Sequence, residues 1–178
     1  DQAADPEFCI PHVPVKGRHG ALDASGPLLR GPGRQQLPLG RVGQFAGSQV
    51  NVPYAYKQLQ NVIVMDYIDG EMLKDSVIDN PQEIFDQVKE QLHLMLHQAR
   101  LIHGDLSEYN MMLDKNDIVY IIDVGQAMGF KSKQDFREFE DLFIRDVENV
   151  CRFFNKKFSL DIDSKQLCAE LQEGLFEE

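Results

Sequence analysis

Hydrophobic residues recur at a helical spacing in three segments of the second half of the chain. The first segment follows Asn80, a suitable N-cap, and Pro81, which fits the first turn of a helix, and it continues for about five turns. A second helix is predicted from Gln134 to Asn155, and a third should begin at Ser164, acting as its N-cap. We expect three sets of residues to face inward: Ile84, Phe85, Val88, Leu92, Met95, Leu96 and Ala99; Phe139, Leu142, Phe143, Val147, Val150, Phe153 and Phe154; and Leu167, Leu171 and Leu175.

Short apolar runs bounded by polar residues predict strands. Tyr54–Tyr56 and Val62–Met65 are two such runs, with a turn expected at Gln60 and Asn61 between them. Met111–Leu113 and Ile118–Ile122 flank the turn-like sequence Asp-Lys-Asn-Asp and should form a second hairpin.

The first fifty residues differ from the rest of the chain in amino-acid composition and in hydrophobic pattern. They contain eight Gly and six Pro and show no sustained apolar period, a composition typical of irregular or disordered chain. The sequence therefore predicts an irregular leader over residues 1–50 and one folded domain over residues 51–178.

Charge and cysteine content narrow the classes of function. The net charge is −11, and residues 1–50 carry five Lys/Arg against four Asp/Glu, so residues 51–178 account for −12. An acidic domain argues against a charge-driven grip on nucleic acid, and we expect no direct sequence-specific binding to it. Three widely spaced cysteines fit a reducing compartment, and no apolar run approaches a membrane span of about 18 residues. A soluble, cytoplasmic protein is expected.

One polar constellation carries the chemistry. His103-x-Asp105 is followed by Asn110, five residues after that Asp, and by Asp123-x-Gly125, eighteen residues after it. Kinase-type phosphoryl transfer needs one carboxylate that orients the hydroxyl nucleophile, and an Asn and a second Asp that hold Mg²⁺ on the phosphates. The predicted hairpin would return Asp123 to the neighbourhood of Asn110. A lone loop Asp is usually a turn residue, but the two spacings favour Asp105 as the catalytic carboxylate, with Asn110 and Asp123 as metal ligands.

The amino-acid sequences of these segments resemble those of the RIO family of atypical serine/threonine protein kinases, and are nearer to its first and third subfamilies than to its second. The matching segments are His-Gly-Asp-Leu-Ser-Glu-Tyr-Asn at 103–110, Ile-Asp-Val-Gly-Gln at 122–126, residues 143–154 and residues 61–68. The resemblance covers residues 52–158 and implies an α+β, protein-kinase-like fold. It would comprise the end of the N-lobe, the hinge and a mostly helical C-lobe that contains a catalytic-loop hairpin.

The resemblance also implies roles, ligands and partners. ATP and Mg²⁺ would be the cofactors, and the adenine edge would meet the backbone of Asp66 and Ile68 at the hinge. Ser107 stands where typical kinases place a lysine that contacts the γ-phosphate, and Asp123 would also accept the phosphoryl group in an aspartyl-phosphate. The parent protein would act on precursors of the small ribosomal subunit. We expect His103 to hold the loop in place, and Gly125 to supply backbone freedom beside the metal ligand.

Two features of a kinase N-lobe are not found in the sequence. Gly31-Pro32-Gly33 lacks a third glycine, and Val13-Pro14-Val15-Lys16 is a poor match to the strand that carries the ATP lysine. No Glu occurs between Glu7 and Glu71 to pair with such a lysine, so the N-lobe is expected to be largely missing or degenerate. Truncation, splicing or a gene-model error would each explain this. Two alternatives stay open: a non-catalytic kinase-like binding module, and a small-molecule phosphotransferase of the aminoglycoside or choline kinase type.

A first prediction follows for the chain of 178 residues. Incubated with radiolabelled ATP and Mg²⁺, it should show negligible hydrolysis and self-phosphorylation, because phosphoryl transfer depends on positioning and charge neutralisation by a phosphate-binding loop and lysine. Turnover that Asp123→Ala abolishes would contradict this expectation, and would mean that residues 1–50 supply a phosphate cradle.

Overall fold

The computed structural model describes residues 48–59 and 62–177, all of which lie within one compact unit, Arg34–Glu178. The expected irregular leader up to residue 47, the Lys16 and Gly31–Gly33 comparisons and the expected turn at Gln60 and Asn61 lie outside the described residues. Ser48 and Val50, at the start of the described chain, are buried, and Val50 belongs to the main hydrophobic core.

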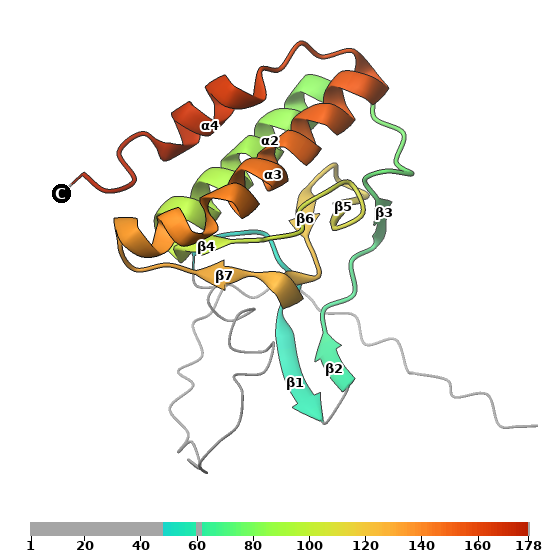
Figure 1. Cartoon of the computed structure of the whole chain (residues 1–178). Helices are drawn as coiled ribbons and strands as arrows, with labels where there is room; N and C mark the ends of the chain where they lie inside the picture. Colours follow the sequence, from blue (N-terminus) through green and yellow to red (C-terminus); the bar gives the residue numbers. More distant parts are fainter. Residues whose placement is uncertain (1–47, 60–61, 178) are drawn as a thin grey trace, which may run out of the picture. The chain divides into compact units, whose positions relative to one another are not determined.

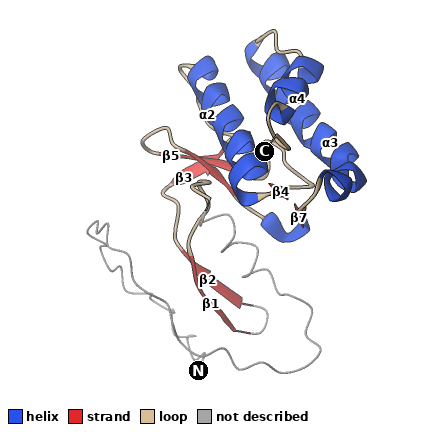
Figure 2. Cartoon of the chain, turned by 90° about the vertical axis from the view of Figure 1, so that its left-hand side faces the viewer, coloured by secondary structure: helices blue, strands red, loops and turns tan. Residues whose placement is uncertain are grey.

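Three α-helices lie together in the C-terminal part of the chain (Figures 1 and 2). They are α2 (Pro81–Leu94), which a π-helical turn extends over Met95–Ala99, α3 (Lys133–Phe158) and α4 (Ser164–Gln172). Asn80 caps α2 by accepting a hydrogen bond from the Glu83 N–H, as the sequence predicts. Arg100, in the left-handed conformation, ends the π-helical turn.

The strands form three small antiparallel sheets in the described residues. β1 (Ala55–Leu59) pairs with β2 (Val62–Met65), β3 (Gly70–Met72) pairs with β5 (Met111–Asp114), which also pairs with β6 (Val119–Ile121), and β4 (Leu101–Ile102) pairs with β7 (Met128–Gly129). Both predicted hairpins are confirmed. In the second hairpin the residue pairs are Met111 with Ile121 and Leu113 with Val119, and all four side chains are buried.

Within residues 48–59 and 62–177, one apolar core joins the helices to the β3–β5–β6 sheet. Aromatic rings from α2 and α3 meet in it, for example Phe85 against Phe154 with ring centroids 5.4 Å apart. Of the residues expected to face inward, all are buried except Ala99, Phe139 and Leu142, which are half-buried against the same core. None of the helices in residues 48–59 and 62–177 is both long and apolar enough to cross a membrane.

Two helix boundaries differ from those predicted. α3 runs from Lys133 to Phe158, because Ser132 forms a capping box with Asp135 and the chain stays helical beyond Asn155. The N-cap of α4 is Asp163 rather than Ser164, since the Asp163 carboxylate accepts hydrogen bonds from the Lys165 and Gln166 N–H groups. A carboxylate one residue earlier satisfies two helix N–H groups at once, and Ser164 becomes the first helical residue.

A buried carboxylate of α3 holds the loop that follows β4. Asp146 accepts hydrogen bonds from the backbone N–H groups of Gly104, at 2.7 Å, and Leu106, at 2.8 Å. Burial raises the pKa of Asp146, and these two bonds oppose that rise. Arg145 donates to the Gly104 carbonyl and Asn149 to the Leu106 carbonyl, so side chains of α3 bind both polar backbone groups of each residue.

The hydrogen bonds from Gly104 and Leu106 to Asp146, called the clamp below, predict a large loss of stability when the carboxylate is removed. Asp146→Ala should lower the free energy of unfolding by roughly 3 to 5 kcal/mol, because two buried N–H groups lose their acceptor. Asp146→Asn should cost roughly half as much, since one acceptor oxygen is kept. Urea denaturation measures both variants, with Asp141→Ala on the exposed face of α3 as the control, expected within about 0.5 kcal/mol of the parent. A loss below about 1 kcal/mol in Asp146→Ala would contradict the clamp.

Candidate active site

The structure brings Asp105 and Asn110 together at the two ends of one tight loop. The Asn110 side-chain Nδ2 donates to the Asp105 carbonyl oxygen at 2.7 Å and lies 3.4 Å from Asp105 Oδ2. The Asn110 backbone N–H donates to the Ser107 carbonyl at 2.9 Å, which closes the loop. Because the amide nitrogen donates to Asp105, the side-chain oxygen of Asn110 is the atom of this amide that could bind a cation. The Asp105 side chain itself is exposed.

Asp123 reaches this loop through the register of the second hairpin. The Ile122 N–H donates to the Asn110 carbonyl at 3.0 Å, one step beyond the Met111–Ile121 pair, and Asp123 is the next residue. Asp123 has a left-handed backbone, with φ 54° and ψ 58°, and its side chain is exposed. The three residues predicted from their spacing therefore lie in two adjoining segments of the chain.

Gly125 lies close to the Asp123 carboxylate. Its backbone does not adopt a positive φ; the left-handed residue of this turn is Asp123. A Cβ at position 125 would lie 3.3 Å from Asp123 Oδ1, so the glycine leaves room for the carboxylate. Gly125 therefore does not use its backbone freedom for a positive φ, and a side chain at this position would make a tight contact with the Asp123 carboxylate.

His103 is buried and joins the loop before Asp105 to the segment before Asp123. Its Nε2 lies 3.0 Å from the Ile122 carbonyl oxygen, which can only accept, so Nε2 carries the hydrogen. Nδ1 is buried and has no hydrogen-bond partner in the described residues. The predicted structural role of His103 is confirmed. The following residue, Gly104, has φ 80°, and a Cβ there would lie 3.0 Å from the Gln126 carbonyl oxygen.

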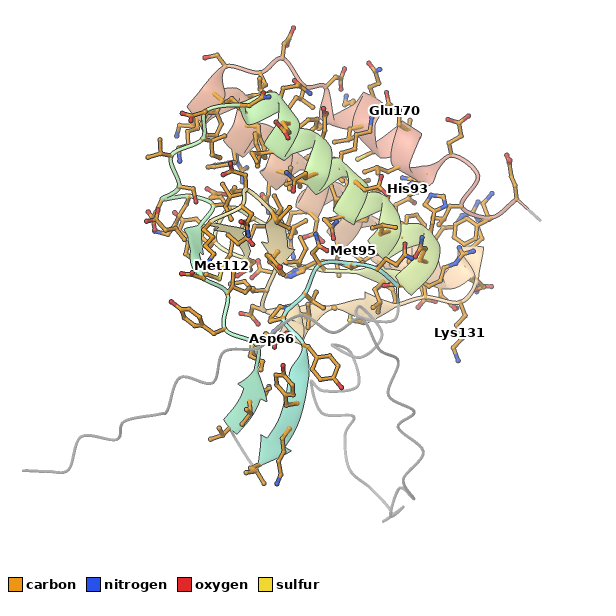
Figure 3. All side chains as sticks on the ribbon, turned by 180° about the vertical axis from the view of Figure 1, so that it is seen from behind. Asp66, His93, Met95, Met112, Lys131 and Glu170 are labelled. Atoms are coloured by element: carbon orange, nitrogen blue, oxygen red, sulfur yellow. The ribbon has the colours of Figure 1, made fainter. Side chains whose placement is uncertain are left out.

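Asp66, at the predicted hinge, closes the base of the β1–β2 hairpin (Figure 3). Its backbone N–H donates to the Tyr54 carbonyl at 2.9 Å, and its carboxylate accepts from the Tyr54 N–H and the Tyr56 hydroxyl. The hydrogen bond with Asp66 raises the pKa of Tyr56. Ile68, the second hinge residue, accepts a hydrogen bond from the Gly70 N–H through its carbonyl. The Asp66 side chain is therefore structural, which leaves the backbone as the part of the hinge that could meet a base.

An apolar cavity of about 200 Å³ adjoins Asp123. Its walls come from the segment before β1, from β2 and from the end of β6 with the following turn: Val52, Pro53, Ile63, Met65, Ile121, Ile122, Asp123, Val124 and Gly125. An apolar hollow with one carboxylate at its edge suits a flat apolar ring that carries a charged group on one side.

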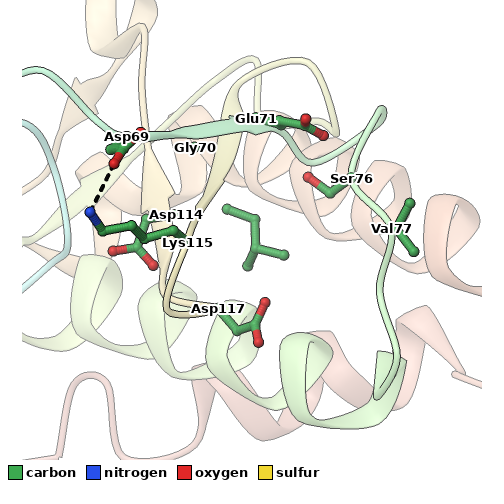
Figure 4. Close-up of a pocket in the computed structure, with 9 residues that line it drawn as sticks. Asp69, Gly70, Glu71, Ser76, Val77, Asp114, Lys115 and Asp117 are labelled. Atoms are coloured by element: carbon green, nitrogen blue, oxygen red, sulfur yellow. Dashed lines mark hydrogen bonds and ion pairs between the residues drawn. The ribbon is translucent and has the colours of Figure 1, made fainter.

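A second, open hollow of about 480 Å³ lies between β3, the β5–β6 turn and the loop before α2 (Figure 4). It is lined by Asp69, Glu71, Asp114 and Asp117, with Lys115 paired to Asp69 at 2.9 Å. Across the described part of the chain, no group of three or more His, Cys, Asp or Glu side chains could hold a metal ion. A cation at the first site would therefore rely on Asn110, Asp123 and oxygens of the ligand.

Sequence analysis assigned only packing to α3 and so missed the residues that hold the loop. Arg145, Asp146 and Asn149 bond the backbone on either side of Asp105. One signal was available: Asp146 lies three residues after Phe143 and four before Val150, on the apolar stripe of the helix. A carboxylate at a core position requires hydrogen-bond donors or an opposite charge, although the sequence does not show which residues supply them.

Sequence comparison identifies the family. A family model described as the RIO domain matches residues 42–167. The RIO-type serine/threonine-protein kinase Rio1 of Haloferax volcanii is 32% identical over 147 residues, covering 80% of this chain and 48% of that protein. The KEOPS complex subunit Bud32 of Pyrococcus abyssi is 42% identical over 126 residues, covering 67% of this chain and 50% of that protein. The chain spans about half the length of these relatives.

Solved structures agree on the fold. The Rio2 kinase of Chaetomium thermophilum, in a crystal structure described as an ADP/Mg²⁺-phosphoaspartate complex, superposes with a TM-score of 0.58 at 24% identity. The match covers 74% of this chain and 42% of that one. The predicted α+β, protein-kinase-like fold is thereby confirmed, and with the RIO model matching well over half of its length, the chain belongs to the RIO family of atypical serine/threonine protein kinases.

Proposed function

We propose that this chain carries the phosphoryl-transfer site of an ATP-dependent serine/threonine kinase of the RIO type. The observation that carries the proposal is the position of Asn110, whose side-chain nitrogen donates to Asp105 while its backbone carbonyl accepts from the Ile122 N–H, next to Asp123. Asp105 would take or orient the proton of the attacking hydroxyl as the γ-phosphoryl group leaves ADP. Ser107, half-buried in the same loop, would face the phosphates.

The donor set fits Mg²⁺. Asn110 and Asp123 would contribute an amide and a carboxylate oxygen, the hard ligands that Mg²⁺ prefers, with phosphate oxygens and water completing the shell. When bound, the cation neutralises charge on the phosphates. Because the described residues offer no closed metal cage, nucleotide and cation would bind together rather than separately.

The nucleotide base would occupy the cavity between β2 and the turn after β6. Met65 lines this cavity and directly precedes Asp66, so the backbone of Asp66 and Ile68 would meet the base edge. Asp123, at the same cavity, would be the acceptor of the phosphoryl group in an aspartyl-phosphate, by analogy with the phosphoaspartate named for the Rio2 crystal structure. Action on small-ribosomal-subunit precursors and a cytoplasmic location are part of the proposal; two free buried cysteines fit a reducing compartment.

Paramagnetic broadening tests where the cation binds. With ADP present, Mn²⁺ added to the ¹⁵N-labelled chain should broaden the amide signals of Asn110 and of residues 122–125, because Mn²⁺ accepts the same oxygen ligands as Mg²⁺. The acidic turn at residues 114–117, at the other end of the hairpin, is the internal control and should broaden less, because a strand rises only about 3.3 Å per residue and the turn lies further from the cation. Broadening centred on that turn, or none with ADP present, would contradict the proposed site.

Matched substitutions test the separate roles of the two aspartates. Asp123→Asn should weaken ADP binding in Mg²⁺ by about tenfold or more, because a ligand charge is lost, whereas Asp105→Asn should stay within about threefold. Asp117→Asn is the control, since Asp117 is also exposed and left-handed, with φ 59° against 54° at Asp123. Titration calorimetry measures all three. An equal loss in Asp123→Asn and Asp117→Asn would show that Asp123 is no metal ligand.

A further inference from the structure

The outer edge of β6 is bonded by Asn51, which lies in the segment before β1. β6 pairs with β5 on one side, and on the other Ile121 N–H donates to the Asn51 carbonyl at 2.8 Å. The Asn51 side-chain Nδ2 donates to the Val119 carbonyl at 3.2 Å. Asn51 therefore bonds both ends of β6, and the second end lies two residues before Asp123.

Asn51 is itself positioned by a buried amide of α2. The Asn51 backbone N–H donates to Gln91 Oε1 at 2.6 Å, and Gln91 is only 6% exposed. Val50, directly before Asn51, is also buried in the core. A continuous line of hydrogen bonds thus runs from Gln91 through Asn51 to Ile121, and from there the backbone leads to Asp123.

A second glutamine of α2, one turn earlier, bonds the same strand at its other end. Gln87 Oε1 accepts from the Val119 N–H at 3.1 Å, and Gln87 Nε2 donates to the Asp117 carbonyl at 2.8 Å. Gln87 therefore holds the hairpin turn, whereas the bonds of Gln91 lead toward Asp123. The two residues provide a natural comparison: Gln87 bonds the hairpin directly near its turn, whereas Gln91 acts on it through Asn51, which also bonds the end of β6 nearer to Asp123.

We propose that Gln91 and Asn51 are positioning residues for Asp123, and that they set the affinity of the site for Mg²⁺ with nucleotide. Mg²⁺ demands near-ideal octahedral geometry, so a small displacement of a ligand oxygen reduces its affinity. The exposed Asp123 lies two residues after the end of β6, and the position of that strand is set by β5 on one edge and Asn51 on the other. The inference rests on the proposed function.

The same segment connects the metal ligand to the cavity. Val52 and Pro53, directly after Asn51, line the apolar cavity together with Asp123 and Gly125. A shift of Asn51 would therefore move one wall of the cavity and the metal ligand together. Mg²⁺ and the base of the nucleotide should for this reason bind cooperatively, and the coupling between them should depend on the Gln91–Asn51 bond.

The test compares substitutions of the two glutamines. The measured quantity is the Mg²⁺ factor, the ratio of the ADP dissociation constant without Mg²⁺ to that with saturating Mg²⁺. Gln91→Leu, which removes the acceptor of the Asn51 N–H, should reduce this factor by about fivefold or more. Gln91→Glu keeps an acceptor oxygen and should restore the factor to within about twofold. Gln87→Leu removes a comparable bond at the turn and should lower resistance to urea while leaving the factor unchanged. Should Gln91→Leu fail to fold, Asn51→Ala removes only the bond to Val119 and should reduce the factor by about twofold to threefold.

The outcomes separate the inference from the function on which it rests. An unchanged factor in Gln91→Leu and Asn51→Ala, or an equal reduction in Gln87→Leu, would overturn the positioning role, because the glutamines would then act through stability alone. If Mg²⁺ does not tighten ADP binding to the unsubstituted chain, the proposed function fails first. A factor that is reduced in Gln91→Leu and Asn51→Ala, unchanged in Gln87→Leu and restored in Gln91→Glu would support both.

Discussion

The loop that carries Asp105 depends on one buried carboxylate. Asp146 accepts from the N–H groups of Gly104 and Leu106, the residues on either side of Asp105, and so replaces the water that those groups would otherwise bind. A neutral side chain of that size could not accept two charge-assisted hydrogen bonds at once. Burial disfavours the charged form, and the neighbouring Arg145 opposes that effect while binding the Gly104 carbonyl. The loop is therefore held through its backbone, and the Asp105 side chain is left exposed.

The second requirement is the register of β5 and β6, because a slip by one residue would turn Asp123 away from Asn110. The turn between these strands holds the register through Asp114, whose Oδ1 accepts from the Asn116 and Ile118 N–H groups. Partial burial opposes ionisation, yet these bonds hold the pKa of Asp114 below its ordinary value. Buried Met111, Leu113, Val119 and Ile121 add a second restraint, since a slip would expose them. A carboxylate at the turn thus contributes to placing a carboxylate at the opposite end of the hairpin.

Much of this site could be predicted from the sequence because its signals are local. The spacing of Asp105, Asn110 and Asp123 indicates the chemistry, and two short apolar runs that flank a turn-like sequence predict the hairpin that brings them together. The cap at Asn80 is local as well, whereas the cap at Asp163 was missed because two adjacent residues could each serve. The roles of Asp146 and Gln91 could not be predicted: each depends on packing against a segment about forty residues away, and sequence periodicity contains no information about such a pairing.

The site divides its polar groups between two tasks. Side chains of α3 bind the backbone of the loop: Asp146, Arg145 and Asn149. Side chains of α2 act on the neighbouring strand, Gln87 directly and Gln91 through Asn51. The side chains of Asp105 and Asp123 remain exposed. A ligand carboxylate that had to break a hydrogen bond to the protein would lose part of its binding free energy to that exchange. Backbone anchoring limits this exchange, because the loop is held through its backbone groups and the Asp105 carboxylate keeps a long contact, 3.4 Å from Asn110 Nδ2. The same arrangement makes the site depend on residues that never touch a ligand.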